Sequence, residues 1–90
     1  MENAALTSEL IRAARALLRW EQRHLADASS VSLPTIKRLE AKRGVLQAHA
    51  STLAALKRTF EGAGIEFIAE NGGGPGVRIR KRPPAKPPKR

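Results

Sequence analysis

Two neighbouring cations, Lys37 and Arg38, are the side chains in this sequence best suited by type and position to bind another molecule. They lie where Ile36 and Leu39 repeat with the spacing of one helical face. An arginine there can donate two hydrogen bonds to O6 and N7 of guanine, which discriminates between bases by about 1–3 kcal/mol. Lysine can do the same or neutralise a phosphate. The net charge of +9 alone leaves nucleic acid, an anionic membrane or an acidic protein open as partners.

Catalytic and metal-binding patterns are weak by comparison. The chain has one aspartate, Asp27, and no set of serine, histidine and aspartate with an obvious common site. His24 and His49 are isolated, and there is no cysteine, so no ligand pair has the spacing of a zinc site. The glycine-rich run at residues 72–76 lacks the lysine and hydroxyl residue of a phosphate-binding P-loop. We therefore expect no enzyme activity, no metal and no cofactor.

Length and composition indicate one domain, residues 1–80, followed by a tail, residues 81–90. Five of the ten tail residues are lysine or arginine, and none is a core-forming residue larger than alanine, so we expect the tail to be disordered. The absence of cysteine fits a reducing cytoplasm. No apolar run of 18 residues and no signal peptide is present, so we expect a cytoplasmic protein without a membrane span.

Helical spacing and capping residues predict four helices, with the segment 42–50 left open for a fifth. Thr7 or Ser8 can cap a first helix that ends near residue 18, with Leu10, Ala14, Leu17 and Leu18 repeating along it. A second helix is predicted over 22–28. A third is predicted over 33–41, with Ser32 as its cap and Pro34 in its first turn. Ser51 can cap a fourth, which carries Leu53, Leu56 and Phe60 and stops at the glycines 62 and 64.

A β-hairpin is predicted to follow the helices. Residues 65–69 and 77–80 alternate between apolar and polar, and a glycine-rich segment joins them. Their pairing could set Glu66 or Glu70 opposite Arg78 or Arg80. The fold class expected from these elements is mainly α, with four to five helices and a C-terminal hairpin over residues 65–80.

The second and third predicted helices have the spacing of a helix-turn-helix, in which two short helices cross steeply across a short turn. Five of six positions, counted from Gln22, carry the residue type that such a crossing requires. The exception is Ser30 in the turn; the full set is Leu25, Ala26, Ser30, Val31, Ile36 and Leu39. Helical hairpins without a DNA function also exist, so the spacing favours DNA binding without establishing it.

Residues 7–80 resemble the phage-repressor-like XRE helix-turn-helix regulators. Residues 14–26 (ARALLRWEQRHLA) are similar to their first helix and the entry to the second, and residues 31–40 (VSLPTIKRLE) to their recognition helix. Residues 64–80 (GIEFIAENGGGPGVRIR) resemble the ending of a compact bacterial subgroup. The resemblance implies a phage-repressor-like DNA-binding domain.

The resemblance also implies roles for individual residues. Contacts to base edges in the major groove are expected from Leu33, Pro34, Lys37 and Arg38. Contacts to DNA phosphates are expected from Gln22, Thr35, Lys42 and Arg43. A structural ion pair is expected between Arg15 and Glu40, tying the first helix to the end of the third.

Four features depart from the family pattern. Arg19 stands where the first helix often ends with glycine, and Glu21 replaces the usual hydroxyl cap of the second helix. Ser30 replaces the usual glycine of the turn, which costs roughly 1 kcal/mol if that backbone is left-handed. The segment 42–50 is not a close match. These features affect affinity and stability more than the fold.

The function expected from these features is transcriptional control, often as a repressor that occludes a promoter. A nucleoid-associated homodimer would bind an inverted repeat in double-stranded DNA, with half-sites about one helical turn apart or a multiple of that. The fourth helix and the exposed edge of the hairpin are the expected dimer surface. Two alternatives stay open: an antitoxin-like protein-interaction module with secondary DNA binding, and a coat that binds nucleic acid regardless of sequence.

Overall fold

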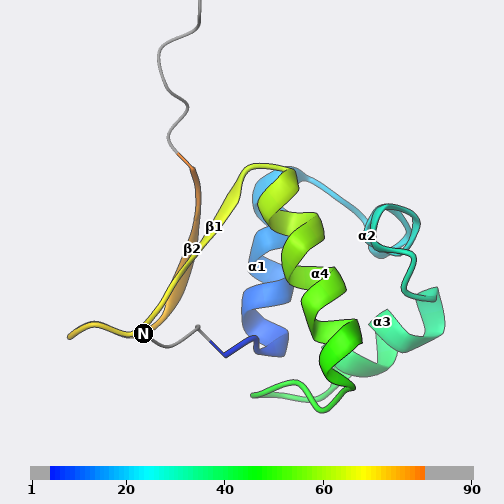
Figure 1. The fold of residues 1–90 in the computed structure, drawn as a ribbon, viewed down its shortest axis with the longest axis horizontal. Helices are drawn as coiled ribbons and strands as arrows, with labels where there is room; N and C mark the ends of the chain where they lie inside the picture. The colour runs from blue at the N-terminus through cyan, green and yellow to red at the C-terminus, as the bar shows by residue number, and fades with distance from the viewer. Residues whose placement is uncertain (1–4, 81–90) are drawn as a thin grey trace, which may run out of the picture.

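The computed structural model describes residues 5–80, which form four helices followed by one β-hairpin (Figure 1). The predicted class of a mainly helical domain with a C-terminal hairpin is confirmed. Residues 1–4 and the tail 81–90, which was expected to be disordered, lie outside the described residues. The elements are α1 (Ser8–Leu18), α2 (Gln22–Ser29), α3 (Leu33–Ala41), α4 (Ala50–Gly62), β1 (Ile65–Ile68) and β2 (Gly76–Ile79).

The hairpin lies on one side of α1 and α4, and the α2–α3 pair lies on the other (Figure 1). β2 packs on α1 and β1 packs on α4, whereas α3 contacts α1 and α2 contacts α4. Every element therefore reaches α1 or α4, and these two helices hold the α2–α3 pair in place. No helix in the part of the chain from residue 5 to residue 80 is long and apolar enough to cross a membrane.

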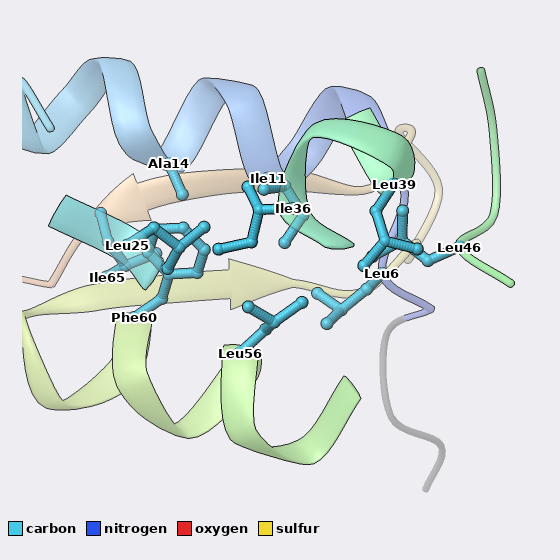
Figure 2. Close-up of a cluster of buried hydrophobic side chains, with 10 residues drawn as sticks. All are labelled: Leu6, Ile11, Ala14, Leu25, Ile36, Leu39, Leu46, Leu56, Phe60 and Ile65. Carbon is cyan, nitrogen blue, oxygen red and sulfur yellow. The ribbon is translucent and has the colours of Figure 1, made fainter. Parts of the chain in front are cut away.

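The core is a cluster of apolar side chains contributed by every helix, the first strand and two loops (Figure 2). On α1, Ile11 enters this cluster with 1% of its surface exposed, whereas Leu17, expected on the inner face, is 41% exposed. Both α1 residues fit a helical repeat, so spacing alone could not decide which of them faces inward. The cluster comprises Leu6, Ile11, Ala14, Leu25, Ile36, Leu39, Leu46, Leu56, Phe60 and Ile65.

The cap of α1 follows the sequence expectation, but that of α4 does not. Thr7 caps α1: its Oγ1 accepts a hydrogen bond from the backbone N–H of Leu10 at 3.0 Å. α4 begins at Ala50, so the residue that precedes it is His49 and not the predicted Ser51. The expectation for Ser51 was wrong because the backbone is already helical one residue before that serine.

The segment 42–49, which sequence patterns left undefined, is an irregular loop pinned to the beginning of α1. The N–H of Ser8 donates to the carbonyl of Gly44 at 2.9 Å, and the N–H of Leu46 donates to that of Leu6 at 3.0 Å. The N–H of Gly44 donates to Glu9 Oε1 at 3.2 Å. Hydrogen bonds from its own N–H and from that of Gly44 hold the pKa of the exposed Glu9 carboxyl below its usual value.

The hairpin pairs Glu66 with Arg78, one of the pairings that the sequence allowed. Arg78 Nε and Nη2 each donate to a Glu66 carboxylate oxygen at 3.1 Å. This hydrogen bonding lowers the pKa of Glu66 and raises that of Arg78. Because both side chains are exposed to water, the pair sets the register of the strands more than it stabilises the fold.

Helices α2 and α3 are joined by a short turn with a left-handed residue. Ser30 follows α2 with φ of 63°, in the backbone region that favours glycine. Its N–H donates to the carbonyl of Ala26 at 2.9 Å, which closes the helix. α3 then begins after Ser32, whose Oγ accepts the N–H of Thr35 at 3.2 Å. Because the backbone of Ser30 is left-handed, a serine at this position lowers the stability of the domain relative to a glycine.

Replacing Ser30 with glycine is expected to raise the free energy of unfolding by about 0.5–1 kcal/mol, because glycine adopts this φ without a Cβ penalty but has more freedom when unfolded. A thermal melt should shift upward by about 2–8 °C in a domain of this size. The matched control is Ala28→Gly in the exposed part of α2, which should cost about 1 kcal/mol. A Ser30→Gly protein no more stable than the parent would contradict a strained turn.

Candidate nucleic-acid interface

Helix α3 is amphipathic, and its outer face carries the residues expected to contact bases. Ile36 and Leu39 are buried on its inner face. On the other side, Pro34, Lys37 and Arg38 are exposed. Leu33, at the first position of the helix, is half-buried. Three of the four expected base-reading residues are thus exposed, and the fourth is partly exposed.

The expected ion pair between Arg15 and Glu40 is present and forms the centre of a larger network. Arg15 Nε donates to Glu40 Oε2 at 2.8 Å, and Arg15 Nη2 donates to Glu40 Oε1 at 2.7 Å. The Glu40 side chain is 4% exposed and that of Arg15 is 19% exposed. Two parallel hydrogen bonds to a carboxylate are the strong form of this interaction. The pair therefore joins α1 to the last turn of α3.

Three further hydrogen bonds converge on the same junction. Gln22 Nε2, at the start of α2, donates to Glu40 Oε1 at 3.0 Å. Arg12 Nη1 donates to the backbone carbonyl of Glu40 at 2.7 Å. Arg15 Nη1 donates to the carbonyl of Trp20 at 3.0 Å. The network therefore fixes α3 against α1, the α1–α2 connection and α2 together.

Because Glu40 is buried, the charged side chains that α3 and the loop after it expose are all of one sign. Glu40 is the only acidic residue between positions 33 and 49, and it is held inside by Arg15. All charged side chains that this segment exposes are therefore basic: Lys37, Arg38, Lys42 and Arg43. One carboxylate from elsewhere in the chain, that of Glu9 on α1, contacts this segment, where it accepts the N–H of Gly44. An anion that approached α3 would meet mainly positive charge.

Arg38 lies between two hollows in this surface. One is lined by residues from the end of α3 and from the loop after it: Arg38, Leu39, Lys42, Arg43, Val45, Leu46 and Gln47. The other lies between α3 and the beginning of α4 and is lined by Thr35, Arg38, Gln47, Ala48, His49 and Thr52. The structure thus brings Thr35, Lys42 and Arg43, three of the expected phosphate contacts, around Arg38.

The fourth expected phosphate contact, Gln22, is placed differently. Its side chain donates a hydrogen bond to Glu40 and so points away from the expected phosphate. Its backbone N–H lies in the first turn of α2, where it has no acceptor within the helix and can donate to a phosphate. The next residues, Arg23 and His24, are exposed. The His24 imidazole is engaged locally, because its Nδ1 accepts the N–H of Glu21 at 3.0 Å.

The second hollow contains polar residues that sequence reasoning missed, namely Gln47, His49 and Thr52. They were missed because the loop 42–49, which carries Gln47 and His49 and leads to Thr52 on α4, has no periodic pattern, so its path back toward α3 could not be predicted. The one available signal was that these polar residues follow the four cations between positions 37 and 43.

No site for a metal ion is evident here. Within residues 5–80, no group of three or more histidine, aspartate or glutamate side chains lies together.

Comparison of the sequence with models of known protein families and with curated proteins gives no match. Assigning a function to this surface therefore rests on its residues and their geometry.

Proposed function

We propose that this chain is a phage-repressor-like regulator that binds double-stranded DNA sequence-specifically, with α3 in the major groove. The observation that carries the proposal is the one-signed surface of α3 and its following loop. Four exposed cations surround a short exposed helix, while the single acidic side chain of the segment is buried. A duplex carries a negative charge on every phosphate, so such a surface attracts it at any sequence.

Sequence preference would come from the exposed side chains of α3. Arg38 can pair with O6 and N7 of a guanine, and Lys37 can pair with a guanine or a nearby phosphate. Pro34 and Leu33 have no side-chain donor or acceptor, so they would contribute apolar contact, most usefully with a thymine methyl. With few hydrogen-bonding readers, part of the preference should come from DNA shape.

Backbone contacts would hold the helix in register. Lys42 and Arg43 follow directly after α3, and Thr35 lies in its first turn. Their contacts to phosphates would position the protein without reading sequence. The backbone N–H of Gln22 would add a contact from α2. None of these contacts needs catalysis, a metal or a cofactor, and we propose that the protein acts by binding alone.

A homodimer on an inverted repeat is part of the proposal. The fourth helix was the helix expected at the dimer surface, but two of the large apolar side chains that the structure exposes, Leu17 at 41% and Ile79 at 56%, lie on α1 and on β2, which packs on α1. The hairpin has only two strands, so each strand has an outer edge that does not pair within the sheet. Both features suit contact with a second copy.

Replacing Arg38 with alanine is expected to relax the preference at one base position and to weaken binding to the preferred site by about 1–3 kcal/mol. The measurement is a selection from random duplexes with the parent and variant proteins, followed by binding titrations on the selected site. The matched control is Arg58→Ala, which removes an exposed arginine from α4 that lines neither hollow. An unchanged preference in the Arg38 variant, or the absence of any preference in the parent, would contradict the proposal.

A further inference from the structure

We infer that the hollow between α3 and the beginning of α4 holds one phosphate of the DNA backbone, and that His49 makes this contact stronger at acidic pH. The inference deepens the proposed function and rests on it. It adds three residues to the interface, Gln47, His49 and Thr52, and makes DNA binding dependent on pH.

The lining of the hollow suits a phosphate. Thr35 and Arg38 form its α3 side, and Gln47, His49 and Thr52 form the other. Each of these five side chains can donate a hydrogen bond, and none is a carboxylate. Phosphate oxygens accept hydrogen bonds from arginine, threonine and glutamine in protein–DNA interfaces. Residues of α3 and of the beginning of α4 line the same hollow, and the two ends lie close together in Figure 1. A DNA backbone that contacts α3 here would therefore come within reach of α4.

The Thr35 hydroxyl is already oriented by its neighbour. Ser32 Oγ and Thr35 Oγ1 are 2.9 Å apart, with the serine as donor. The Thr35 hydroxyl hydrogen is then free to point elsewhere, because the threonine oxygen is the acceptor in this contact. A phosphate in the hollow would provide the acceptor.

His49 is the group in this hollow whose charge can change near neutral pH, because imidazole titrates between about pH 5 and 8. His49 is exposed, and its side chain makes no capping hydrogen bond to α4 in the described structure. The charged group that faces it across the hollow is Arg38 of α3; the loop and α4 contribute the uncharged Gln47, Ala48 and Thr52.

The direction of the pH effect follows from these charges. A phosphate in the hollow would attract a positive charge on His49 as well as the charge of Arg38. DNA binding would therefore be accompanied by proton uptake, and affinity would rise as the pH falls. The effect should be the same on all sequences, since the contact is to the backbone.

The chain offers a matched control, since it has two histidines, His24 and His49. The full chain is titrated with a fluorescent duplex carrying the selected site at about pH 7 and about pH 5.5, a range in which the α-amino group stays mostly protonated. Parent affinity should rise by about twofold to fourfold at the lower pH, the size of an exposed charge pair. The slope of log affinity against log salt should steepen by up to about 0.9, the value for one more phosphate contact.

His49→Gln should remove both the pH effect and the change in slope, whereas His24→Gln should keep them. Thr52→Val should weaken binding at both pH values and on random duplexes alike, because it removes one donor from the hollow. A pH effect that survives in His49→Gln, or a Thr52→Val protein with parental affinity, would overturn the inference while leaving the proposed function intact. A parent that binds no duplex at either pH would instead overturn the proposed function.

Discussion

Replacing Glu40 with alanine is expected to lower the free energy of unfolding by about 3 kcal/mol. The substitution removes the acceptor of two hydrogen bonds from Arg15 and one from Gln22. Arg15 would be left as a mostly buried cation without its carboxylate, and its 19% exposure places the cost at the low end of that for a broken buried pair. The measurement is urea unfolding followed by the fluorescence of Trp20, the only tryptophan in the chain.

The matched control for Glu40 is another glutamate that pairs with an arginine through two hydrogen bonds. Glu66→Ala breaks the pair with Arg78 in the hairpin, but both of those side chains are exposed. Its unfolding midpoint should stay close to that of the parent, because water replaces the lost contact. If Glu40→Ala were as stable as Glu66→Ala, the network at the end of α3 would not be what holds that helix in place.

The same variant links stability to the proposed function. Glu40 contacts α1 and α2 through Arg15 and Gln22, and its backbone carbonyl accepts a hydrogen bond from Arg12. The alanine variant keeps the backbone bond and loses the others, so the last turn of α3 should become less well positioned. DNA affinity should therefore fall even at temperatures where the variant is folded, although no residue on the outer face of α3 has changed.

Local chemistry explains why the helices could be predicted from sequence. Each of the first three begins at a residue whose role is readable without the fold, Thr7 and Ser32 as caps and Gln22 after a short connection. Ile36 and Leu39 marked the inner face of α3 because their spacing leaves one side for the core. The residues on the opposite side of α3 could therefore be predicted to face outward.

What could not be predicted depends on contacts between distant segments. The loop 42–49 is shaped by hydrogen bonds to Leu6, Ser8 and Glu9, more than 30 positions earlier in the chain. Gln22 was expected to reach a phosphate through its side chain or backbone, and its side chain turns inward because Glu40 lies within reach. The choice of Ile11 over Leu17 for the core likewise depends on where the other helices lie.

The side chains of Trp20, Phe60 and Phe67 meet in one aromatic cluster beside the hairpin. The rings of Trp20 and Phe60 are stacked, with centroids 5.9 Å apart. Phe67 meets Phe60 edge-on at 6.0 Å. Phe60 itself is fully buried. The cluster therefore joins the α1–α2 connection, α4 and the first strand.

Replacing Phe60 with alanine is expected to cost about 3–5 kcal/mol, because it removes a buried ring and leaves a cavity. Its two aromatic partners would also lose their ring contacts. A domain of this length is typically stable by only about 5–10 kcal/mol, so the variant should unfold at much lower urea or temperature. Phe60→Leu, which keeps most of the side-chain volume, is the control and should fall between the variant and the parent.

The Phe60 variant also tests how the proposed DNA-binding surface depends on the rest of the molecule. Phe60 lies on α4, and Trp20 lies in the connection that leads into α2. If the domain unfolds as one unit, Trp20 fluorescence and helical circular dichroism should report the same lowered midpoint for Phe60→Ala. Coincident midpoints would mean that α3 is presented only while the aromatic cluster is intact. If Trp20 fluorescence changed at lower urea than the helical signal, the α2–α3 pair would be held by the Glu40 network without help from this end of the core.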